Sequence, residues 1–225
     1  GAAGLFDLLG PDPSEDFDVD VTLPVAVVGG GGAGKTALVR RFARGGFAEE
    51  RRRTLAAEFV EKRVTLGECG EEVTFHIWDT PGSEDPGALA ERCCKRAKAC
   101  VIVFSTDDRS SFEAVGDWAA AVRGASGRDV LLVLVQTKRD LAGGAEAEVA
   151  EAEAEAVAQL LGLRLCVASA RDGSGTSEVF HYLGEELLRR QREAEERFRC
   201  GEARGGLQWG DPAGPPGGAA RAEGS

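Results

Sequence analysis

The sequence predicts an α/β fold: a mostly parallel six-stranded sheet with one antiparallel edge strand and helices on both faces. Two observations lead to this prediction. Short apolar runs, typical of buried parallel strands, alternate along the 225 residues with segments of helical apolar spacing. The turn-rich stretch GECGEE also separates two segments that suit strands, which predicts a hairpin and therefore an antiparallel edge.

The strands are predicted from short apolar segments. Ala99–Phe104 and Val130–Val135 are purely apolar over six residues each, as expected of central strands that are buried on both faces. The two segments beside GECGEE form the expected hairpin. The expected strands are Leu23–Val28, Phe59–Leu66, Val73–Trp78, Ala99–Ser105, Asp129–Gln136 and Arg164–Ala168.

The helices are predicted from apolar spacing and capping patterns. Leu38, Val39 and Phe42 have helical spacing, and Ser110 followed by Glu113 is a capping-box pattern. An acidic segment and a long charged segment predict two further helices. The expected helices are Thr36–Ala43, one opening near Ser110, one over about Ala145–Leu161, and one from about Ser177 to beyond Arg190.

Composition divides the chain into three parts. Residues 1–22 form an acidic leader that we expect to be disordered, because six acids and no base fall between Asp7 and Asp20. Residues 23–192 form the folded domain, and residues 193–225 form a helix extension followed by a disordered tail rich in glycine, proline and alanine. The net charge of −11, without a basic stripe, argues against nucleic acid as a partner.

The sequence contains no apolar run long enough to span a bilayer, and no secretory signal is visible at its start. The six cysteines form no paired C-x-x-C units, and only two histidines are present, so a zinc site is not expected. We expect reduced thiols, with Cys100 and Cys166 buried in strands, and a cytoplasmic location.

The stretch GGGGAGKT, from Gly29 to Thr36, matches G-x-x-x-x-G-K-[ST] and lies between an expected strand and an expected helix. In that setting backbone amides and the helix dipole favour phosphate, Lys35 reaches the terminal phosphates, and Thr36 presents its hydroxyl to Mg²⁺. The residues expected to line the phosphates are Gly31, Gly32, Ala33, Gly34, Lys35, Thr36 and Ala37.

Three later segments follow expected strands. DTPG offers Asp79 as a Mg²⁺ ligand, usually through water, and the Gly82 amide for a terminal phosphate. TKRD offers the Asp140 carboxylate, which accepts two hydrogen bonds from guanine that adenine does not supply. The third segment is SAR, from Ser169 to Arg171. The residues of TKRD and SAR that are expected to contact the nucleoside are Thr137, Lys138, Asp140, Ser169, Ala170 and Arg171.

With these motifs in order, the sequence resembles the Ras-like small GTPases over about Leu23 to Gln191, and within them the Rab proteins. WDTPGSED, ACVIVFSTDDRSSFEAV and LVQTKRDL carry the Rab resemblance and are similar to the Rab subgroup associated in animals with cilia and Hedgehog signalling. The resemblance implies the three-layer P-loop GTPase fold (G domain), with GTP or GDP and Mg²⁺ as cofactors.

The resemblance also implies roles for individual residues. Thr54 binds Mg²⁺ in the GTP state together with Thr36 and Asp79, and Phe47 packs against guanine. The segments near 51–59 and 82–96 are the two switches that effectors and regulators contact. Phe59 and Trp78 belong to the effector-facing surface, although Trp78 is equally well explained as a core residue. The catalytic positions implied are Lys35, Thr54, Gly82 and Ser83.

Several positions depart from the family pattern. Ser83 stands where the family carries the glutamine that orients the attacking water, so slow unaided GTP hydrolysis is expected. Cys93 and Cys94 replace two tyrosines. The chain ends RAEGS, so no C-terminal lipid anchor is visible, and membrane association is expected only through partners.

Two functions remain open at this point. The chain is either a Rab-type switch in vesicle or ciliary trafficking, or a nucleotide-stabilised subunit of a larger complex that does not cycle. The expected magnesium ligands Thr36, Thr54 and Asp79 favour the first function, whereas Ser83 and the missing lipid site favour the second.

Overall fold

The structure is a computed structural model that describes residues 21–47, 54–67, 70–127 and 129–204, with side chains as far as Arg199. Most of the acidic leader, part of the first expected switch and the C-terminal tail lie outside the described residues. The chain divides after Arg189 into two units, 1–189 and 190–225.

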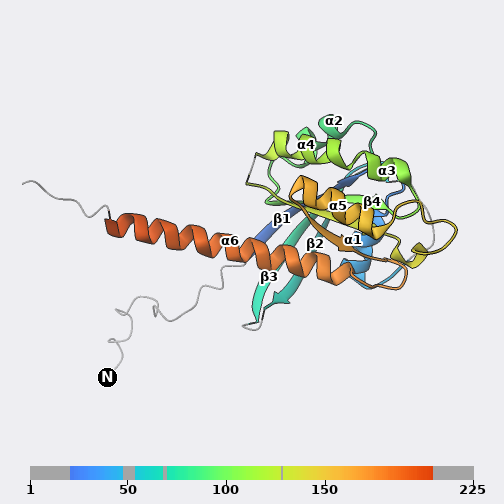
Figure 1. The fold of residues 1–225 in the computed structure, drawn as a ribbon. Coiled ribbons are helices and arrows are strands. Elements are labelled where there is room, and N and C mark those ends of the chain that lie inside the picture. The colour runs from blue at the N-terminus through green and yellow to red at the C-terminus, as the bar shows by residue number, and fades with distance from the viewer. Residues whose placement is uncertain (1–20, 48–53, 68–69, 128, 205–225) are drawn as a thin grey trace, which may run out of the picture. The chain divides into compact units, whose positions relative to one another are not determined.

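The six-stranded sheet confirms the predicted fold class. Its strand order is β2-β3-β1-β4-β5-β6, and every neighbouring pair is parallel except β2 with β3 (Figure 1). Every residue of β4 and β5 is buried, as the apolar runs predicted. The strands are β1 Val21–Gly29, β2 Glu58–Leu66, β3 Glu71–Asp79, β4 Ala99–Ser105, β5 Leu131–Thr137 and β6 Arg164–Val167.

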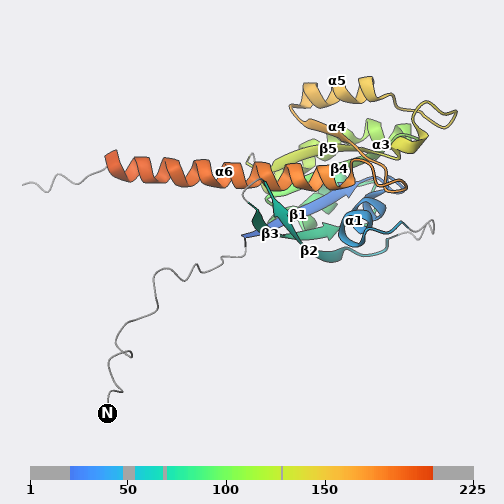
Figure 2. The same ribbon diagram turned by 90° about the horizontal axis from the view of Figure 1, so that it is seen from below.

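Helices cover both faces of the sheet (Figure 2). α1 and the first part of α6 pack on one face, and α2, α3, α4 and α5 pack on the other, each layer with its own apolar core. The helices are α1 Lys35–Arg44, α2 Pro86–Cys93, α3 Arg109–Glu113, α4 Val115–Ser126, the 3-10 turn η1 Arg139–Leu141, α5 Glu151–Leu161 and α6 Thr176–Arg204.

Aromatic packing joins α1 and α6 to the sheet. The rings of Phe42 and Phe180 stack with centroids 4.0 Å apart, and Phe75 of β3 meets Phe42 edge-on at 5.9 Å. Phe75 and Phe180 are fully buried. This cluster fixes α1, and with it the glycine-rich loop that leads into α1, against the sheet.

One predicted helix cap and one predicted helix start were wrong, although a helix does open near Ser110 as expected. α3 begins at Arg109 and is capped by Asp108, whose carboxylate accepts from the Ser111 amide at 3.2 Å, so Ser110 is not the cap. The acidic helix begins at Glu151, six residues after the predicted Ala145. Val149 is instead buried in a non-helical segment, where the Glu148 and Val149 amides donate to the Thr106 carbonyl at 2.9 and 3.1 Å.

Three other details differ from expectation. β1 starts at Val21, inside the stretch assigned to the leader. α2 was not predicted, although Asp85 followed by Pro86 is a start signal: the Asp85 carboxylate accepts from the Ala88 amide at 3.0 Å. Cys166 is partly exposed because β6 is an edge strand, whereas Cys100 is buried as expected.

The second unit is described as far as residue 204, where it forms the C-terminal part of α6. Its ion pairs lie along the helix, as between Arg197 and Glu193 at 3.5 Å. Phe198 is 69% exposed. These features agree with the predicted charged helix extension.

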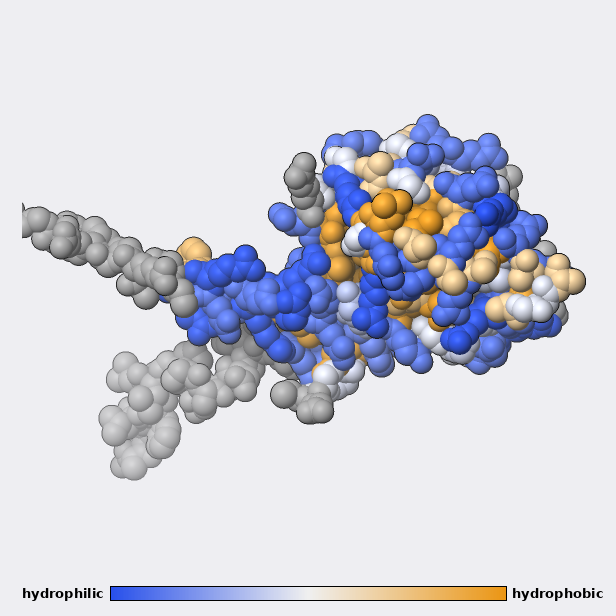
Figure 3. Space-filling view, viewed as in Figure 1, coloured by the Kyte–Doolittle hydropathy of each residue, from blue (hydrophilic) through white to orange (hydrophobic). Residues whose placement is uncertain are grey.

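The surface of the first unit is mostly polar, with apolar side chains gathered over the region of α5 in the view of Figure 3. Leu160 of α5 is the clearest case at 84% exposed. Within the described residues, no helix combines the length and apolar character that crossing a membrane requires.

Truncating Phe180 to alanine should lower the free energy of unfolding by about 3–5 kcal/mol, because the cavity would separate α6 from α1 and β3. Urea denaturation followed by circular dichroism measures the change. Phe198→Ala is the matched control, since Phe198 is exposed, and it should change stability by less than about 0.5 kcal/mol. Equal effects of the two substitutions would contradict this account of the core.

Candidate functional site

The predicted phosphate and nucleoside segments meet at one edge of the sheet. β1, β3, β5 and β6 are mutually parallel, so their carboxyl ends share an edge. Gly29 ends β1, Asp79 ends β3, Thr137 ends β5, and Ser169 lies two residues beyond β6. The tertiary structure therefore brings together all four segments that the sequence singled out.

The glycine-rich loop closes around its own lysine. Lys35 Nζ donates to the Gly29 carbonyl at 2.9 Å and to the Gly30 carbonyl at 2.6 Å. Gly82 lies directly against this loop: a Cβ added at Gly82 would come within 2.4 Å of the Gly31 Cα. Only glycine fits this approach between the DTPG segment and the loop.

The three predicted metal ligands lie together. The hydroxyls of Thr36 and Thr54 are 2.7 Å apart, and Thr36 also hydrogen-bonds the Asp79 carboxylate. Asp79 is 1% exposed, and its Oδ1 has no hydrogen-bond partner among the described residues. Two hydroxyls and a carboxylate with an unpartnered oxygen are a donor set that suits a hard cation such as Mg²⁺.

Burial perturbs both charged groups of the site. It lowers the pKa of Lys35 to about 8, an effect only partly offset by the negative charge of Asp79. Burial also raises the pKa of Asp79, against the hydrogen bond from Thr36 and the charge of Lys35. Each group is therefore destabilised in its charged form, and a ligand that supplies counter-charge would relieve the cost.

Thr137 connects the base-side segment to the glycine-rich loop. Its buried hydroxyl lies 2.6 Å from the Ala33 carbonyl and 3.0 Å from the Phe104 carbonyl. Gly34 has φ +89, a backbone conformation that favours glycine, and an added Cβ would stand in a tight contact 3.1 Å from the Thr137 hydroxyl. The side chain predicted to contact the nucleoside therefore joins the end of β5 to the glycine-rich loop and to β4.

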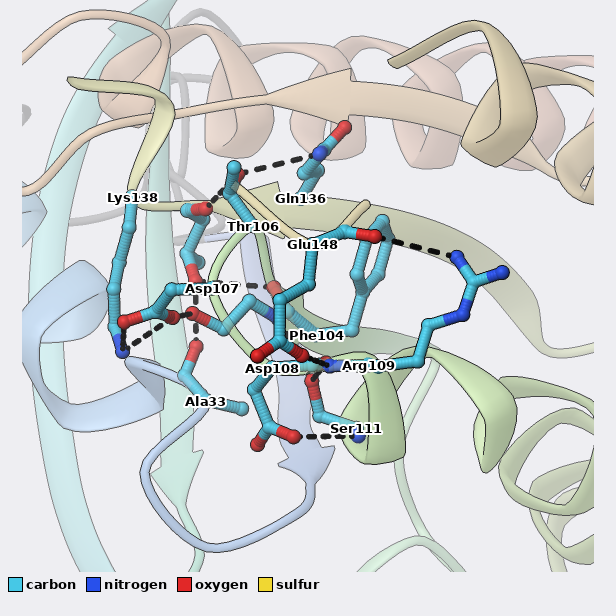
Figure 4. A network of polar contacts seen from close by, with 12 residues as sticks. Ala33, Phe104, Thr106, Asp107, Asp108, Arg109, Ser111, Gln136, Lys138 and Glu148 are labelled. Atoms are coloured by element: carbon cyan, nitrogen blue, oxygen red, sulfur yellow. Dashed lines mark hydrogen bonds and ion pairs between the residues drawn. The ribbon is translucent and has the colours of Figure 1, made fainter. Parts of the chain in front are cut away.

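Lys138 adopts a left-handed backbone conformation with φ 57, the one non-glycine case among the described residues. Its ammonium group donates to the two carboxylate oxygens of Asp107 at 2.8 and 2.9 Å (Figure 4). Burial of Asp107 is outweighed by the hydrogen bonds from Lys138 and Ser105, which lower its pKa. A positive φ at a lysine is backbone strain of the kind that collects at binding sites.

The Asp140 carboxylate is oriented by the segment that follows β6. Ser169 donates its hydroxyl to Asp140 Oδ1 at 2.6 Å, and the Arg171 guanidinium lies 3.7 Å from Oδ2. Ala170, between them, is partly buried. TKRD and SAR thus form one structural unit, as their shared prediction requires.

Sequence reasoning overlooked Asp107 and Thr106, which follow β4. Asp107 holds Lys138, and the Thr106 hydroxyl donates to the Thr137 carbonyl at 2.7 Å. Their position in the sequence could have revealed them, because both residues directly follow β4, a buried strand that lies between β1 and β5. Polar residues at that point reach the same edge as the motifs.

Other predicted residues lie on the surface. Phe47 is 42% exposed, so its side chain is open to contact with a ligand. Phe59 and Trp78 are 48% and 42% exposed, and their ring centroids are 5.2 Å apart. The alternative that Trp78 is a core aromatic is therefore wrong.

The Ser83 hydroxyl is used within its own turn. It donates to the Asp85 carbonyl at 3.1 Å and accepts from the Asp85 amide at 3.0 Å. Cys93 is partly exposed, and Cys94 is buried. Ser83 is thus occupied by local contacts at the position where the family pattern has a catalytic glutamine.

Three features lie at one edge of this sheet: a glycine-rich loop with a buried lysine, the Asp79 carboxylate at the end of β3 and an oriented aspartate after β5. Together with the strand order, they place the protein in the P-loop nucleotide-binding class with the topology of a G domain. The chain belongs to the Ras family of small GTPases: the family model matches residues 24–189.

Relatives that the chain resembles include Rab proteins. It is 32% identical over 177 residues to Ras-related protein Rab-21 of Geodia cydonium, which covers 79% of this chain and 76% of that protein. It is 30% identical to Ras-related protein Rab-12 of Mus musculus, over 76% of this chain and 69% of that one. It is also 32% identical to GTP-binding protein YPT53 of Saccharomyces cerevisiae, over 74% and 77%.

The lowered pKa of Lys35 predicts a pH dependence for the stability of the ligand-free protein. The native pKa, about 8, lies below the ordinary lysine pKa of 10.5, so the unfolded chain binds more protons between these values and stability rises with pH across that window. Lys35→Met should remove this rise, which amounts to roughly 2–3 kcal/mol. Urea unfolding at several pH values measures it.

The exposed Lys98 provides the control for that measurement. Lys98→Met should keep the wild-type rise in stability between pH 8 and 10.5. Parallel pH profiles for the wild type and Lys35→Met would show that burial of the Lys35 ammonium has no energetic cost.

Proposed function

We propose that this protein is a Rab-type molecular switch that binds GTP and GDP with Mg²⁺ and recruits effectors when GTP is bound. The proposal rests on three groups that lie at one edge of the sheet. They are the phosphate loop, the cluster of Thr36, Thr54 and Asp79, and the Asp140 carboxylate. Binding and exchange of fluorescent GTP and GDP analogues test it.

The phosphates would lie against the amides of residues 31–37, with Lys35 turned from the Gly29 and Gly30 carbonyls toward the terminal oxygens. Thr36, Thr54 and Asp79 would hold Mg²⁺, Asp79 through a water molecule. When bound, the ion neutralises charge on the terminal phosphates. Phosphate would then compensate the buried Lys35 ammonium, and the ion would compensate the unpartnered Asp79 oxygen.

Guanine selectivity would come from Asp140. Its carboxylate accepts from the N1–H and exocyclic amine of guanine, while Ser169 keeps Oδ1 in position. Lys138 would lay its methylene groups across the nucleoside, since its ammonium is held by Asp107 at the far end. The Ala170 amide would donate to the guanine oxygen, and Phe47 would pack on the base.

Unaided hydrolysis is expected to be slow. Phosphoryl transfer depends on positioning the attacking water and on stabilising charge. Ser83 is short, and its hydroxyl is engaged by Asp85, so it does not supply the group that orients water. Lys35, Thr54 and Gly82 would act on the phosphates, and an activating protein would supply the missing element.

Partners would contact the switch segments near 51–59 and 82–96, with Phe59 and Trp78 as the exposed aromatic pair. The GTP-dependent order of these segments would select the partner. We assign the protein to the cytoplasm, with membrane association through partners, and within the Rab proteins to a role in vesicle or ciliary trafficking. Motifs such as ACVIVFSTDDRSSFEAV support the ciliary part of this assignment.

A second candidate is a nucleotide-stabilised subunit of a larger, possibly ciliary, complex that does not cycle. The engagement of Ser83 by Asp85 favours it, because a site without a water-orienting group retains GTP. Measurable exchange of bound nucleotide supports the switch, whereas permanent retention of one nucleotide supports the subunit.

Asp140→Asn should weaken GDP binding by at least about a hundredfold, because an amide N–H would then face the donor groups of guanine. The same substitution should improve binding of xanthosine diphosphate, whose C2 oxygen accepts a hydrogen bond. Calorimetry with both nucleotides measures the change. Asp117→Asn, on the exposed face of α4, is the control and should leave GDP affinity intact. Undiminished GDP binding by Asp140→Asn would contradict the assigned base site.

Ser83→Gln should raise unaided GTP hydrolysis by about tenfold or more, since glutamine is long enough to orient water beside the terminal phosphate. Single-turnover hydrolysis with the purified protein gives the rate. Glu84→Gln supplies the same side chain one position further along and should leave the rate within about twofold. Wild-type turnover as fast as that of Ser83→Gln would refute the explanation that the lack of a glutamine at position 83 slows unaided hydrolysis.

A further inference from the structure

Four basic residues gather at the end of α2, in a protein whose net charge is −11. The first lies in the last turn of α2, the next two lie in the turn that follows, and the fourth directly precedes β4. We call this group the α2 basic cluster, and its members are Arg92, Lys95, Arg96 and Lys98. Four bases and one acid give the stretch 91–98 a formal charge of +3.

All four residues of the α2 basic cluster are exposed. Lys95 Nζ lies 3.1 Å from Glu91 Oε2, one helical turn away. The side chains of the other three make no hydrogen bond or ion pair within the part of the chain that the structure describes. Since like charges so close together repel one another, this surface favours contact with an anionic group.

The start of β1 lies beside this cluster. The Lys98 amide donates to the Pro24 carbonyl at 2.9 Å, and β4 pairs with β1 only from Val25 onward. Val21 begins β1 three residues before Pro24, about 10 Å away at the rise of an extended chain. The segment that precedes Val21 therefore enters the fold within reach of Lys98.

The segment before β1 is strongly acidic. Residues 1–20 lie outside the described residues, but the sequence gives their charge: six acids and no base occur between Asp7 and Asp20. Six residues of chain span up to about 20 Å, so one turn of the chain would bring the last acids beside the α2 basic cluster. The four acids within the six residues directly before β1 are Glu15, Asp16, Asp18 and Asp20.

The opposite flank of β1 is less favourable for the same segment. On that side Val21 pairs with Val73 of β3, which directly follows Glu71 and Glu72. The Arg63 guanidinium lies 3.8 Å from the Glu72 carboxylate. This flank thus carries two carboxylates and one guanidinium, so electrostatic attraction directs an acidic segment to the β4 side of β1.

We propose that residues 15–20 dock on the α2 basic cluster of the same chain through ion pairs. A single exposed ion pair stabilises little. However, four carboxylates attached directly to β1 are present beside the cluster at an effective concentration of the order of millimolar. The cations need not converge on one point, because the carboxylates are themselves spread over six residues.

This docking would cover the end of the second expected switch, near 82–96. Arg92, Lys95 and Arg96 all belong to that segment, so an acidic partner that uses them would have to displace residues 15–20. The effect on partners rests on the proposed function. The docking itself does not involve nucleotide, so its test does not depend on nucleotide binding.

Zero-length cross-linking with a carbodiimide tests the contact in the full-length protein without nucleotide. The reagent joins a carboxylate and a lysine amine in an amide bond and takes up the water that is lost. Mass spectrometry of the digested monomer should find links from residues 15–20 to Lys95 and Lys98. In 1 M salt, where the screening length is about 3 Å, the yield of these links should fall at least about fivefold.

A matched pair of substitutions locates the contact. Arg96→Glu should lower the yield of these links at least about threefold, because it places a negative charge within the cluster. Arg139→Glu is the control, since Arg139 is also exposed but follows β5 at the opposite edge of the sheet. It should leave the yield unchanged.

A charge exchange gives a second, independent readout. Each reversed set alone should yield no links between the two segments, whereas the combined variant should restore links from the new lysines to the new carboxylates. The leader-reversed set is Glu15→Lys, Asp16→Lys and Asp18→Lys. The cluster-reversed set is Arg92→Glu, Arg96→Glu and Lys98→Glu.

Several outcomes would overturn the proposal. Links between chains, seen as a dimer on a denaturing gel, would mean that a second copy supplies the acidic segment. Absent links would leave the α2 basic cluster to an outside acidic partner. Links that do not respond to salt or to Arg96→Glu, or a combined variant without links, would contradict the ion pairs. If the cluster-reversed variant fails to fold, the salt dependence and Arg96→Glu decide the question.

Discussion

The buried hydroxyl of Thr137 is the contact on which the arrangement of the site depends. It lies within hydrogen-bonding distance of the Ala33 carbonyl in the glycine-rich loop and of the Phe104 carbonyl in β4. Without such a contact, the loops that follow different strands would not be held at a fixed distance from each other. This hydroxyl sets the distance between the phosphate side and the base side of the proposed nucleotide site, and Gly34 is the residue that leaves room for it.

The charged groups at this edge are held at an electrostatic cost. The ammonium of Lys35 is turned onto carbonyls of its own loop, and the Asp79 carboxylate keeps one oxygen without a partner among the described residues. Burial disfavours the charged form of both groups. A ligand that brings negative phosphate and a cation together would offset both costs at once, which explains why the two groups are tolerated side by side in the interior.

Thr106 links the two faces of the sheet near this edge. Its hydroxyl donates to the Thr137 carbonyl and accepts from the Gln136 amide, so one side chain contacts two consecutive residues at the end of β5. Its carbonyl also accepts hydrogen bonds from the Glu148 and Val149 amides, which hold the segment before α5 in a non-helical conformation. These two hydrogen bonds account for the start of α5 at Glu151, after this segment.

The sequence by itself determined the fold class, the strand order along the chain and the motifs, because apolar periodicity and loop chemistry are local properties. A few neighbouring residues were enough to recognise each of the four motifs, GGGGAGKT, DTPG, TKRD and SAR. Only the tertiary structure decided that Asp107 holds Lys138 and that α5 begins at Glu151. Hydrogen bonds between segments that are distant in the chain leave no periodic pattern in the sequence. The start of α5 also depends on tertiary packing, because Val149, just before it, is buried in the core.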